Sequence, residues 1–543
     1  MPEGSAPVHR PDNGAGRVAR PLFLACFVLL WAASARQGPT GDASSMTAVA
    51  RSIALEGRLD LGYRSLGYTV EGIDGLHYAK FPLPWSLVEV PGQWVERTLS
   101  VSALPMDVKD LYTRLVRGVT PAAAGAVAIV LLFLALARTG LPARRALALS
   151  LAFHLATCAL PYLTSHYSEV FQVLAVNLGL WALAGFVDRP GARASAWLGF
   201  ACGLLCLAKI VLAPVALVLA LVAWRSATRT RTPVLRLAAW ALAAAAAPLA
   251  VLAAYNVVRF GVPVTADYGW FPIPPRIEHP TLERLYGLTL SSGRGLLWFA
   301  PLSVLAMAGV RSPGRPRSVL EPASAGAFVA MLLVYASFTV WHGSEQWGPR
   351  FLVPMVGPLA FMASGPFFRL WDRGLMAKLV PISLVLAGLA VNLGGLLVSH
   401  DDFFAAVPYR PYNEIHLDLE DRPTVPVESD NLYRTNFVPA FSPIAGHWWL
   451  AAHAILGGDP ASDCPWRGVV ADAGGTPPGA PPSPLRTPAL VPRLDQWWWP
   501  GDDWDDGTST IALALALVMG LALAGAWIEV ARALEPGRPG REA

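Results

Sequence analysis

The chain has 543 residues, of which 54% are hydrophobic and only 15% are charged, and its formal net charge is +4 at pH 7. A soluble protein of this length carries charge on about a quarter of its residues, so the composition excludes an ordinary soluble enzyme. The small net charge gives no reason to expect a nucleic-acid partner. The apolar residues fall in blocks of roughly 15 to 22, long enough to cross a bilayer, which predicts an all-α polytopic membrane protein.

Twelve apolar blocks are the predicted membrane spans. They cover residues 22–35, 119–137, 147–160, 170–187, 197–207, 210–224, 237–255, 295–310, 327–340, 351–367, 379–398 and 511–528. The short fifth and sixth blocks would alternatively form one kinked or re-entrant element, which would invert everything after them. With a cytoplasmic N-terminus and twelve spans, every alternate short connection is rich in arginine, as in Arg138, Arg144 and Arg145. The positive-inside rule therefore favours twelve separate spans.

This topology divides the chain into four parts. Residues 1–20 are a cytoplasmic tail, and residues 21–400 form the transmembrane region, in which residues 36–118 are a long first outer loop. Residues 401–509 are a Pro-, Gly- and Trp-rich segment, expected to be mostly irregular and extracytoplasmic. Residues 510–543 hold the last span and a cytoplasmic tail. The preference for Arg over Lys and the many Ala, Gly and Pro residues fit GC-rich coding, so we expect a bacterial inner (cytoplasmic) membrane.

The stretch GDASSMTAVARSIALEG predicts an amphipathic helix directly after the first span. Met46, Val49 and Ile53 recur at helical spacing, and Gly57 would end the helix, which is expected to lie in the membrane interface. Asp42 stands just before the first turn, where its side chain would cap the helix N-terminus. The same carboxylate, held at the membrane surface, would also serve as a general base, and the two interpretations are compatible.

The first outer loop also contains the segment HYAKFPLP, which places Lys80 among aromatic residues and prolines. A lone lysine near a membrane interface commonly extends its ammonium to lipid head groups. The alternative is that Lys80 binds a phosphate, with His77 and Tyr78 beside it as substrate contacts. The prolines that follow would hold the lysine in a fixed place.

An Asp after the first span, an amphipathic helix and then a Tyr-x-Lys-x-Pro segment together resemble the GT-C superfamily of polytopic membrane glycosyltransferases. The nearest members in pattern are the protein O-mannosyltransferases and the aminoarabinose transferases that modify lipid A. In that pattern Asp42 matches the catalytic base and Lys80 matches the lysine that contacts the lipid phosphate. The resemblance covers residues 20–400 as topology and short motifs, and it implies a GT-C-type bundle with interfacial helices in its first outer loop.

The second outer loop, LTSHYSEV, provides a second acidic residue, Glu169, flanked by His166 and Tyr167. The resemblance implies a catalytic acid at this place, although the chain has Ser-Glu-Val where many relatives have Asp followed by Pro. His166 and Tyr167 are then candidate substrate contacts. The alternative is an interfacial belt of Tyr and His, with Glu169 capping the fourth span.

Two later segments, LSSGRGLLWFAP and WHGSEQWGPRFLVP, are predicted to reach the same face. Each contains an arginine, Arg294 or Arg350, whose guanidinium would bind a phosphate at two points or pair with a nearby acid. Trp347 is expected to anchor the membrane interface. The second segment adds three candidate substrate contacts: Trp341, His342 and Glu345.

The leading hypothesis is an integral-membrane glycosyltransferase acting on the extracytoplasmic face. Its donor would be a polyprenyl-phosphate-linked sugar, with the phosphate held by Lys80 and by Arg294, Arg350 or both. Asp42 would take the proton of an acceptor hydroxyl that attacks the anomeric carbon with inversion, as the resemblance implies. The acceptor would be a glycan, a lipid or a protein.

The main alternative is a transporter or flippase of lipid-linked sugars, and an envelope polysaccharide ligase or a non-catalytic scaffold is a further one. Transport sites need ionisable residues deep within spans, for which His154 and Lys209 are the candidates. No internal repeat relates the two halves, which counts against transport. No His, Asp or Glu cluster has metal-ligand spacing, so we expect no cofactor and no metal.

Overall fold

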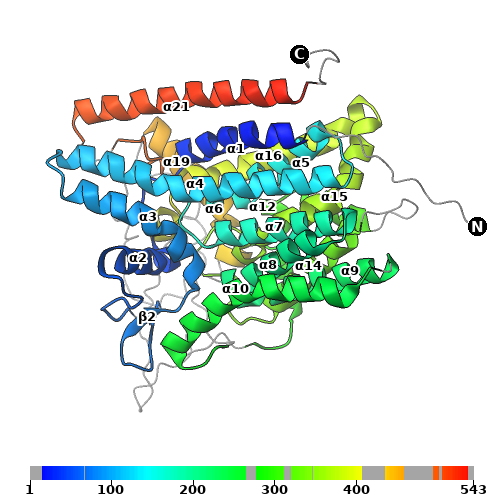
Figure 1. Ribbon diagram of the computed structural model, residues 1–543. Helices are drawn as coiled ribbons and strands as arrows, with labels where there is room; N and C mark the ends of the chain where they lie inside the picture. Colours follow the sequence, from blue (N-terminus) through cyan, green and yellow to red (C-terminus); the bar gives the residue numbers. More distant parts are fainter. Residues whose placement is uncertain are drawn as a thin grey trace, which may run out of the picture.

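The computed structural model describes residues 15–65, 68–230, 232–264, 277–310, 319–344, 346–406, 435–457, 493–500 and 504–535. Glu345 lies outside the described residues. Helices make up most of the described chain, and the long ones run side by side across Figure 1. They are α1 (Ala15–Ala32), α4 (Met106–Arg138), α7 (Glu169–Asp188), α8 (Ala192–Ala208), α9 (Ala213–Arg229), α10 (Val234–Phe260), α14 (Leu320–Ala336), α15 (Val356–Asp372), α16 (Leu375–Leu397) and α21 (Asp506–Ala533).

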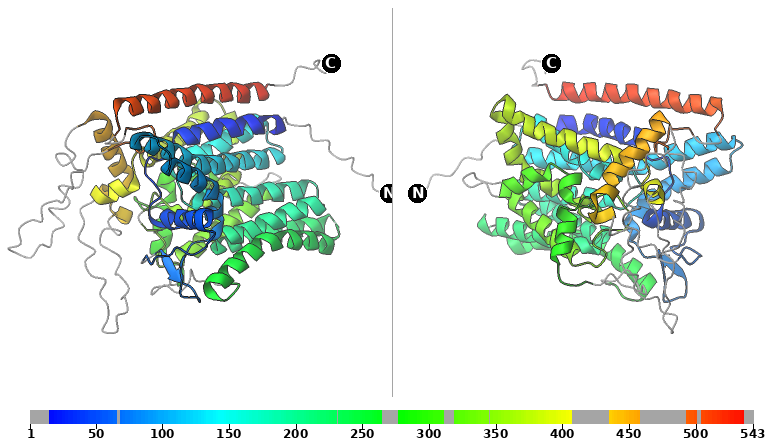
Figure 2. Two further views of the ribbon diagram at one scale, coloured as in Figure 1. Left: turned by 60° about the vertical axis from the view of Figure 1, so that its left-hand side comes forward. Right: turned by 180° about the vertical axis from the view of Figure 1, so that it is seen from behind.

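Shorter helices connect or cover the long ones. They are α5 (Ala143–Leu155), α6 (Ala159–Leu163), α11 (Leu282–Thr289), α12 (Leu296–Phe299), α13 (Ser303–Val310), α17 (His400–Ala406), α19 (Pro443–Leu456) and the 3-10 helices η1 (Ile210–Leu212), η2 (Arg350–Met355) and η3 (Pro439–Phe441). One end of the bundle also carries α2 (Gly41–Glu56), α3 (Leu83–Ser100) and the strands β1 (Thr69–Glu71) and β2 (His77–Ala79). We call it the hairpin end; it lies on the left of Figure 1 and is seen from two other sides in Figure 2.

The all-α, polytopic membrane class is confirmed. Within the described ranges, eight helical segments are long and apolar enough to cross a membrane: α1, α4, α7, η1 with α9, α10, η2 with α15, α16 and α21. The apolar helices α8 and α14 are shorter, and α5 and α13 are shorter still. Helix occupies most of each predicted block, although the blocks 147–160 and 295–310 are each interrupted, and four of these helices fall short of a standard span.

The fifth and sixth predicted spans form two separate helices, because Lys209 between them is extended (φ −168°, ψ 121°). Small residues bring α8 and α10 together: a Cβ on Gly199 would lie 1.9 Å from the Ala241 carbonyl oxygen. Such close backbone contact replaces the hydrophobic driving force that is missing between helices in lipid.

The amphipathic helix after the first span is present as α2, and it ends at Gly57 as predicted. Gly57 adopts the left-handed conformation (φ 66°) that commonly ends a helix. The capping prediction for Asp42 is wrong. The N-cap is Thr40, and Asp42 lies inside the first turn, so its carboxylate is free to point to another partner.

A two-stranded antiparallel hairpin, β1–β2, is the one sheet in the described part of the chain, and the sequence analysis did not predict it. Val70 pairs with Tyr78 in its register, and its turn contains Asp74 and Gly75, with φ 76° at the glycine. An Asp-Gly pair between β-branched and aromatic residues is a hairpin signal that the analysis overlooked. The hairpin matters because Lys80 follows it directly.

Most of the predicted irregular segment 401–509 lies outside the described residues. Its stretch FSPIAGHWWL forms η3 and α19, and α19 packs against α16. Trp497 and Trp498 donate their indole hydrogens to the carbonyls of Trp31 and Ala32, at distances of 3.0 and 3.1 Å. These tryptophans therefore attach the segment to the end of α1.

Candidate functional site

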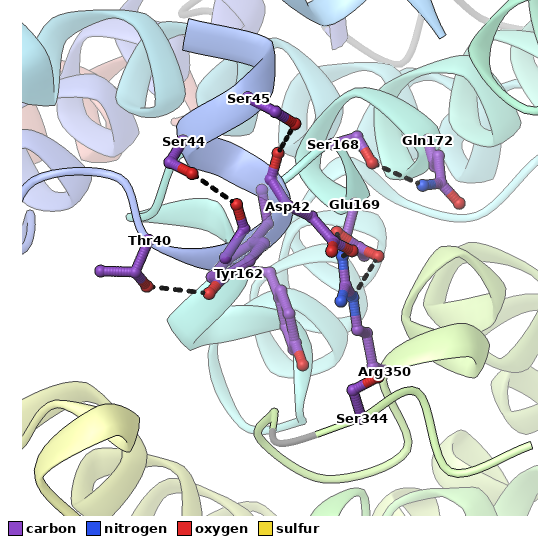
Figure 3. Close-up of polar contacts among 12 residues, drawn as sticks. Thr40, Asp42, Ser44, Ser45, Tyr162, Ser168, Glu169, Gln172, Ser344 and Arg350 are labelled. Atoms are coloured by element: carbon purple, nitrogen blue, oxygen red, sulfur yellow. Dashed lines mark hydrogen bonds and ion pairs between the residues drawn. The ribbon is translucent and has the colours of Figure 1, made fainter. Parts of the chain in front are cut away.

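An arginine shared by two carboxylates forms the centre of the site (Figure 3). Arg350 Nη2 lies 2.8 Å from Asp42 Oδ2, and Arg350 Nε lies 2.6 Å from Glu169 Oε1. The side chains of Arg350 and Glu169 are only 6% and 1% exposed, whereas that of Asp42 is 26% exposed. Asp42 is thus the carboxylate of the pair that a substrate can reach.

Helix ends position all three side chains. Asp42 lies in the first turn of α2, Glu169 is the first residue of α7, and Arg350 is the first residue of η2. Carboxylates at the starts of α2 and α7 are favoured by the partial positive charge of helix N-termini. The structure therefore brings together residues 42, 169 and 350 from three distant parts of the sequence.

Arg294 holds the loop that precedes Arg350 by hydrogen bonds. Its side chain is fully buried, and it donates to Asn436 Oδ1 at 2.9 Å, to the Gly348 carbonyl at 3.2 Å and to the Ser344 carbonyl at 2.6 Å. Ser344 has φ 64°, an unfavourable value for a residue with a Cβ, so this loop needs such support. These bonds favour a structural role for Arg294 over binding of a phosphate.

Two lysines lie near the triad. Lys80 is half-buried, with Nζ 5.0 Å from the centre of the Phe81 ring; burial lowers its pKa, the charge of Asp42 raises it and that of Arg350 lowers it. Lys209 has Nζ 4.7 Å from the centre of the Phe351 ring. Burial lowers the pKa of Lys209 to about 8, and the charges on both carboxylates, on Arg350 and on Lys80 also act on it. Three cations therefore surround two carboxylates, which leaves a surplus of positive charge.

Arg259, at the end of α10, holds the segment that carries Lys80. It donates to the Ala79 carbonyl at 2.9 Å and to the Phe81 carbonyl at 3.5 Å, on either side of Lys80. Its side chain is 4% exposed, and it also donates to Asn256 Oδ1 at 2.9 Å. The sequence analysis assigned the fixing of Lys80 to the prolines and missed this arginine.

A second buried carboxylate, Glu89 of α3, lies behind His166. Glu89 accepts a hydrogen bond from Thr47 at 2.7 Å and contacts His166 Nδ1 at 2.6 Å. The Glu89 side chain is 3% exposed, and that of His166 is 11% exposed. This contact fixes the orientation of the His166 ring beside a cavity described below. A lone acid in the run WSLVEVPG was the available sequence signal for Glu89.

Tyr167 lies beside Arg350, so its predicted place in the site agrees with the structure. Its ring centre lies 5.0 Å from Arg350 Cζ, and its hydroxyl is 3.3 Å from that of Thr40. Burial raises the pKa of Tyr167 to about 12, so its hydroxyl keeps its proton. Tyr167 thereby joins the loop before α7 to the start of α2.

Four predicted substrate contacts have other roles in the structure. Tyr78 donates to Asp74 at 2.7 Å within the hairpin, and His77 lies on the same hairpin opposite Glu71. Trp341 is buried against Gly287, and His342 Nδ1 accepts from the Ser344 amide at 3.0 Å. Among the described residues, no hydrogen bond or ion pair joins these four residues to the triad of Asp42, Glu169 and Arg350.

The interfacial role predicted for Trp347 is wrong, because its side chain is 3% exposed and donates to Asn392 at 2.9 Å. His154, a candidate for transport, is fully buried, with its ring nitrogens 2.8 Å from the Ser150 carbonyl and 3.1 Å from Asn177. Its polar atoms are satisfied by helix packing. Lys209, the other candidate for transport, lies near the triad instead.

The chain is similar to structures of ArnT. ArnT from Cupriavidus metallidurans bound to undecaprenyl phosphate has 14% identity and a TM-score of 0.44, covering 94% of this chain and 77% of that one. The apo state of the same protein has 15% identity and a TM-score of 0.45, covering 94% and 76%. No family model and no curated protein matches the sequence. With values this low, the function has to be argued from the side chains of the site.

In the described part of the chain, no group of three or more His, Cys, Asp or Glu side chains could hold a metal ion. The residues that meet at the site are two carboxylates, an arginine and two lysines, which suit an anion rather than a divalent cation. Metal independence therefore stays a prediction.

Proposed function

We propose that this protein is an integral-membrane glycosyltransferase that moves a sugar from a polyprenyl-phosphate donor to a hydroxyl acceptor on the extracytoplasmic face. The observation that carries the proposal is the cluster of Asp42, Arg350, Lys80 and Lys209 at the end of an apolar helix bundle. An accessible carboxylate supplies a base, and the surplus of positive charge supplies a site for a phosphate. A donor with a polyprenyl tail would reach such a site from within the bilayer.

In the proposed reaction the acceptor oxygen forms a bond to the anomeric carbon while the bond from that carbon to the phosphate oxygen breaks. Asp42 takes the hydroxyl proton, and the electron pair of the broken bond leaves with the polyprenyl phosphate. Lys80, Lys209 and Arg350 stabilise the negative charge that develops on the departing phosphate, an effect that often dominates such barriers. Attack from the face opposite the phosphate gives inversion.

Arg350 has two roles in this proposal. In the absence of donor its guanidinium is shared by Asp42 and Glu169, and Glu169 holds it by the shorter contact. A bound phosphate would compete with Asp42 for the same guanidinium, which would free the Asp42 carboxylate to accept a proton. Glu169 is thus proposed to position Arg350 rather than to exchange protons, which refines the catalytic role predicted for it.

The test compares Asp42→Asn with wild type in nanodiscs, with release of polyprenyl phosphate from a panel of polyprenyl-phosphate sugars as the readout. General-base help is worth about 10²–10⁴ in rate, so transfer is expected to fall at least 100-fold while polyprenyl phosphate still binds. Asp372→Asn is the matched control, because Asp372 also pairs with an arginine, Arg145, at 2.9 Å. It lies at the other end of α15, about 25 Å away at 1.5 Å per residue. Near-normal transfer by Asp42→Asn would refute the role of the base.

Transport of the same lipid-linked sugar would need exposed ionisable residues along a path through the spans. The two candidates, His154 and Lys209, are accounted for by helix packing and by the phosphate site. No contact in the described residues favours transport over transfer.

A further inference from the structure

A cavity of about 100 Å³ lies beside Asp42, on residues that the proposed chemistry has not used. Thr40 and Ala43, on either side of Asp42 in the chain, line it together with Tyr167, whose ring lies by Arg350. Figure 3 shows Thr40 and Glu169 on opposite sides of Asp42. A ligand in this cavity would therefore lie next to the proposed base, and neither Lys80 nor Lys209 lines it.

The hydroxyl groups that line the cavity donate their hydrogens to the protein itself. Tyr162 donates to the Trp347 carbonyl at 2.7 Å, and Thr164 donates to the Pro161 carbonyl at 3.0 Å. Ser165 and Ser399 do the same, to the Tyr162 carbonyl and the Gln37 side-chain oxygen. Few hydroxyl hydrogens are left for a ligand.

By contrast, two neighbouring histidines, His400 and His447, leave one ring nitrogen as a hydrogen-bond acceptor at the cavity. His447 Nδ1 is 2.7 Å from the Pro443 carbonyl and must carry a hydrogen, so His447 Nε2 accepts from His400 Nδ1 at 3.1 Å. His400 lines the cavity, and its remaining nitrogen, Nε2, is buried and makes no side-chain or backbone hydrogen bond of normal geometry to the described residues; the Gln346 backbone, on the same wall, raises the pKa of His400 against the larger lowering by burial. A buried acceptor without a partner destabilises the structure, and a hydrogen from a ligand would remove that cost.

One histidine and two carboxylates also line the cavity. The histidine is His166, whose Nδ1 is held 2.6 Å from Glu89. Asp401 has an exposed side chain, and Asp495 has one carboxylate oxygen bonded to the Gln37 amide at 3.0 Å. Burial raises the pKa of Asp495 to about 7, so a hydrogen-bond donor or a cation from a ligand would stabilise its charged form.

We propose that this cavity is the acceptor subsite and that it takes the hydroxyl-rich edge of a neutral or amine-bearing sugar and excludes an anionic one. The assignment of the cavity to the acceptor rests on the proposed function. The class of ligand that the cavity binds follows from its lining residues alone. A cavity of about 150 Å³ holds a benzene ring. A cavity of about 100 Å³ therefore admits one edge of a sugar ring. That edge would supply hydrogens to His400, Asp401 and Asp495 while one hydroxyl faces Asp42.

The test measures the binding of three probes to the full-length protein in nanodiscs by saturation-transfer difference NMR. The probes are methyl α-glucoside, glucosamine and glucuronate, which share a ring and differ in charge. Methyl α-glucoside and glucosamine are expected to bind. Glucuronate is expected to bind at least tenfold more weakly, because the carboxylates of Asp401 and Asp495 repel its carboxylate and His400 Nε2 has no hydrogen to donate to it. Equal binding of glucuronate, or no binding of the other two probes, would overturn the proposal.

Two variants locate the binding. His400→Phe removes the unpartnered acceptor and is expected to weaken both sugars several-fold, and Asp401→Asn, at an exposed position that does not threaten folding, is expected to weaken glucosamine most. His279→Gln, on an exposed loop outside the cavity, is the control. Binding that neither cavity variant changes would refute the location. Polyprenyl phosphate binding is measured in parallel, so that its absence would contradict the proposed donor while leaving the sugar result to stand.

Discussion

Replacing Arg350 by Gln, alone and together with Glu169→Gln, should distinguish what Arg350 contributes to stability from what it contributes to sugar transfer. The variant leaves Glu169, whose side chain is 1% exposed, without the guanidinium that lies 2.6 Å away. Coulomb's law at that distance, with an effective dielectric of about 20, gives an attraction of about 6 kcal/mol before desolvation is counted. Breaking one partner out of a buried pair costs about 3–5 kcal/mol in practice, and we expect a loss of unfolding free energy in that range.

The double variant Glu169→Gln with Arg350→Gln should regain about 2–3 kcal/mol of that loss, because no unpaired buried charge remains. Asp42 keeps its carboxylate in both variants, and water can reach its side chain, which is 26% exposed. Both variants are expected to lose sugar transfer, because the phosphate loses its arginine in each. The double variant should therefore recover stability without recovering sugar transfer.

The measurement is equilibrium unfolding in mixed micelles, followed by tryptophan fluorescence, with transfer assayed on the same preparations. Arg145→Gln is the control, because it breaks a pair with Asp372 whose side chains are 39% and 52% exposed and should cost less than about 1 kcal/mol. A double variant no more stable than Arg350→Gln would refute the reasoning. So would an Arg350→Gln protein as stable as wild type.

Three further predictions follow from neighbouring contacts. Burial lowers the pKa of Lys209 to about 8, so its positive charge is lost as pH rises through that value. In binding titrations, the affinity of wild type for polyprenyl phosphate should therefore fall several-fold from pH 7 to 9, and that of Lys209→Arg should not. Arg259→Gln removes hydrogen bonds to the backbone on both sides of Lys80, and a bond from a charged group is worth about 1.5–3 kcal/mol. In steady-state kinetics, the KM for the sugar donor should therefore rise at least tenfold, with a smaller change in kcat. Gly199→Ala places a Cβ 1.9 Å from a backbone oxygen of α10 and should lower the thermal stability, whereas Gly520→Ala, with open space around it, should not.

The sequence was sufficient to predict the membrane class, because hydropathy and arginine placement depend on local composition. It also predicted that residues 42, 169 and 350 would reach the same end of the bundle, since that follows from counting spans. The hairpin before Lys80 was missed because its strands have three residues each, too short for an alternating pattern to stand out. Lys209 was weighed as a transport residue, because a sequence places it at a helix end but not beside Glu169.

Arg294 and Arg350 show why the site itself could not be read from sequence. Both arginines precede an apolar segment at the same end of the bundle, and both follow a glycine or a proline. What separates them is the kind of oxygen that surrounds each guanidinium. Arg294 is bonded to two backbone carbonyls and an amide oxygen, neutral acceptors that hold a loop.

Arg350 instead faces two carboxylates of unequal exposure, so one of its partners is fixed and the other can be displaced. A guanidinium with one exchangeable carboxylate is already arranged to accept a phosphate at the same position, because both anions offer paired oxygens to its planar fork. The displaced carboxylate, Asp42, is the one whose chain neighbours Thr40 and Ala43 line the cavity. Binding of the donor phosphate would therefore release the base beside the acceptor, and this coupling depends on the exposure of Asp42, which only the three-dimensional arrangement reveals.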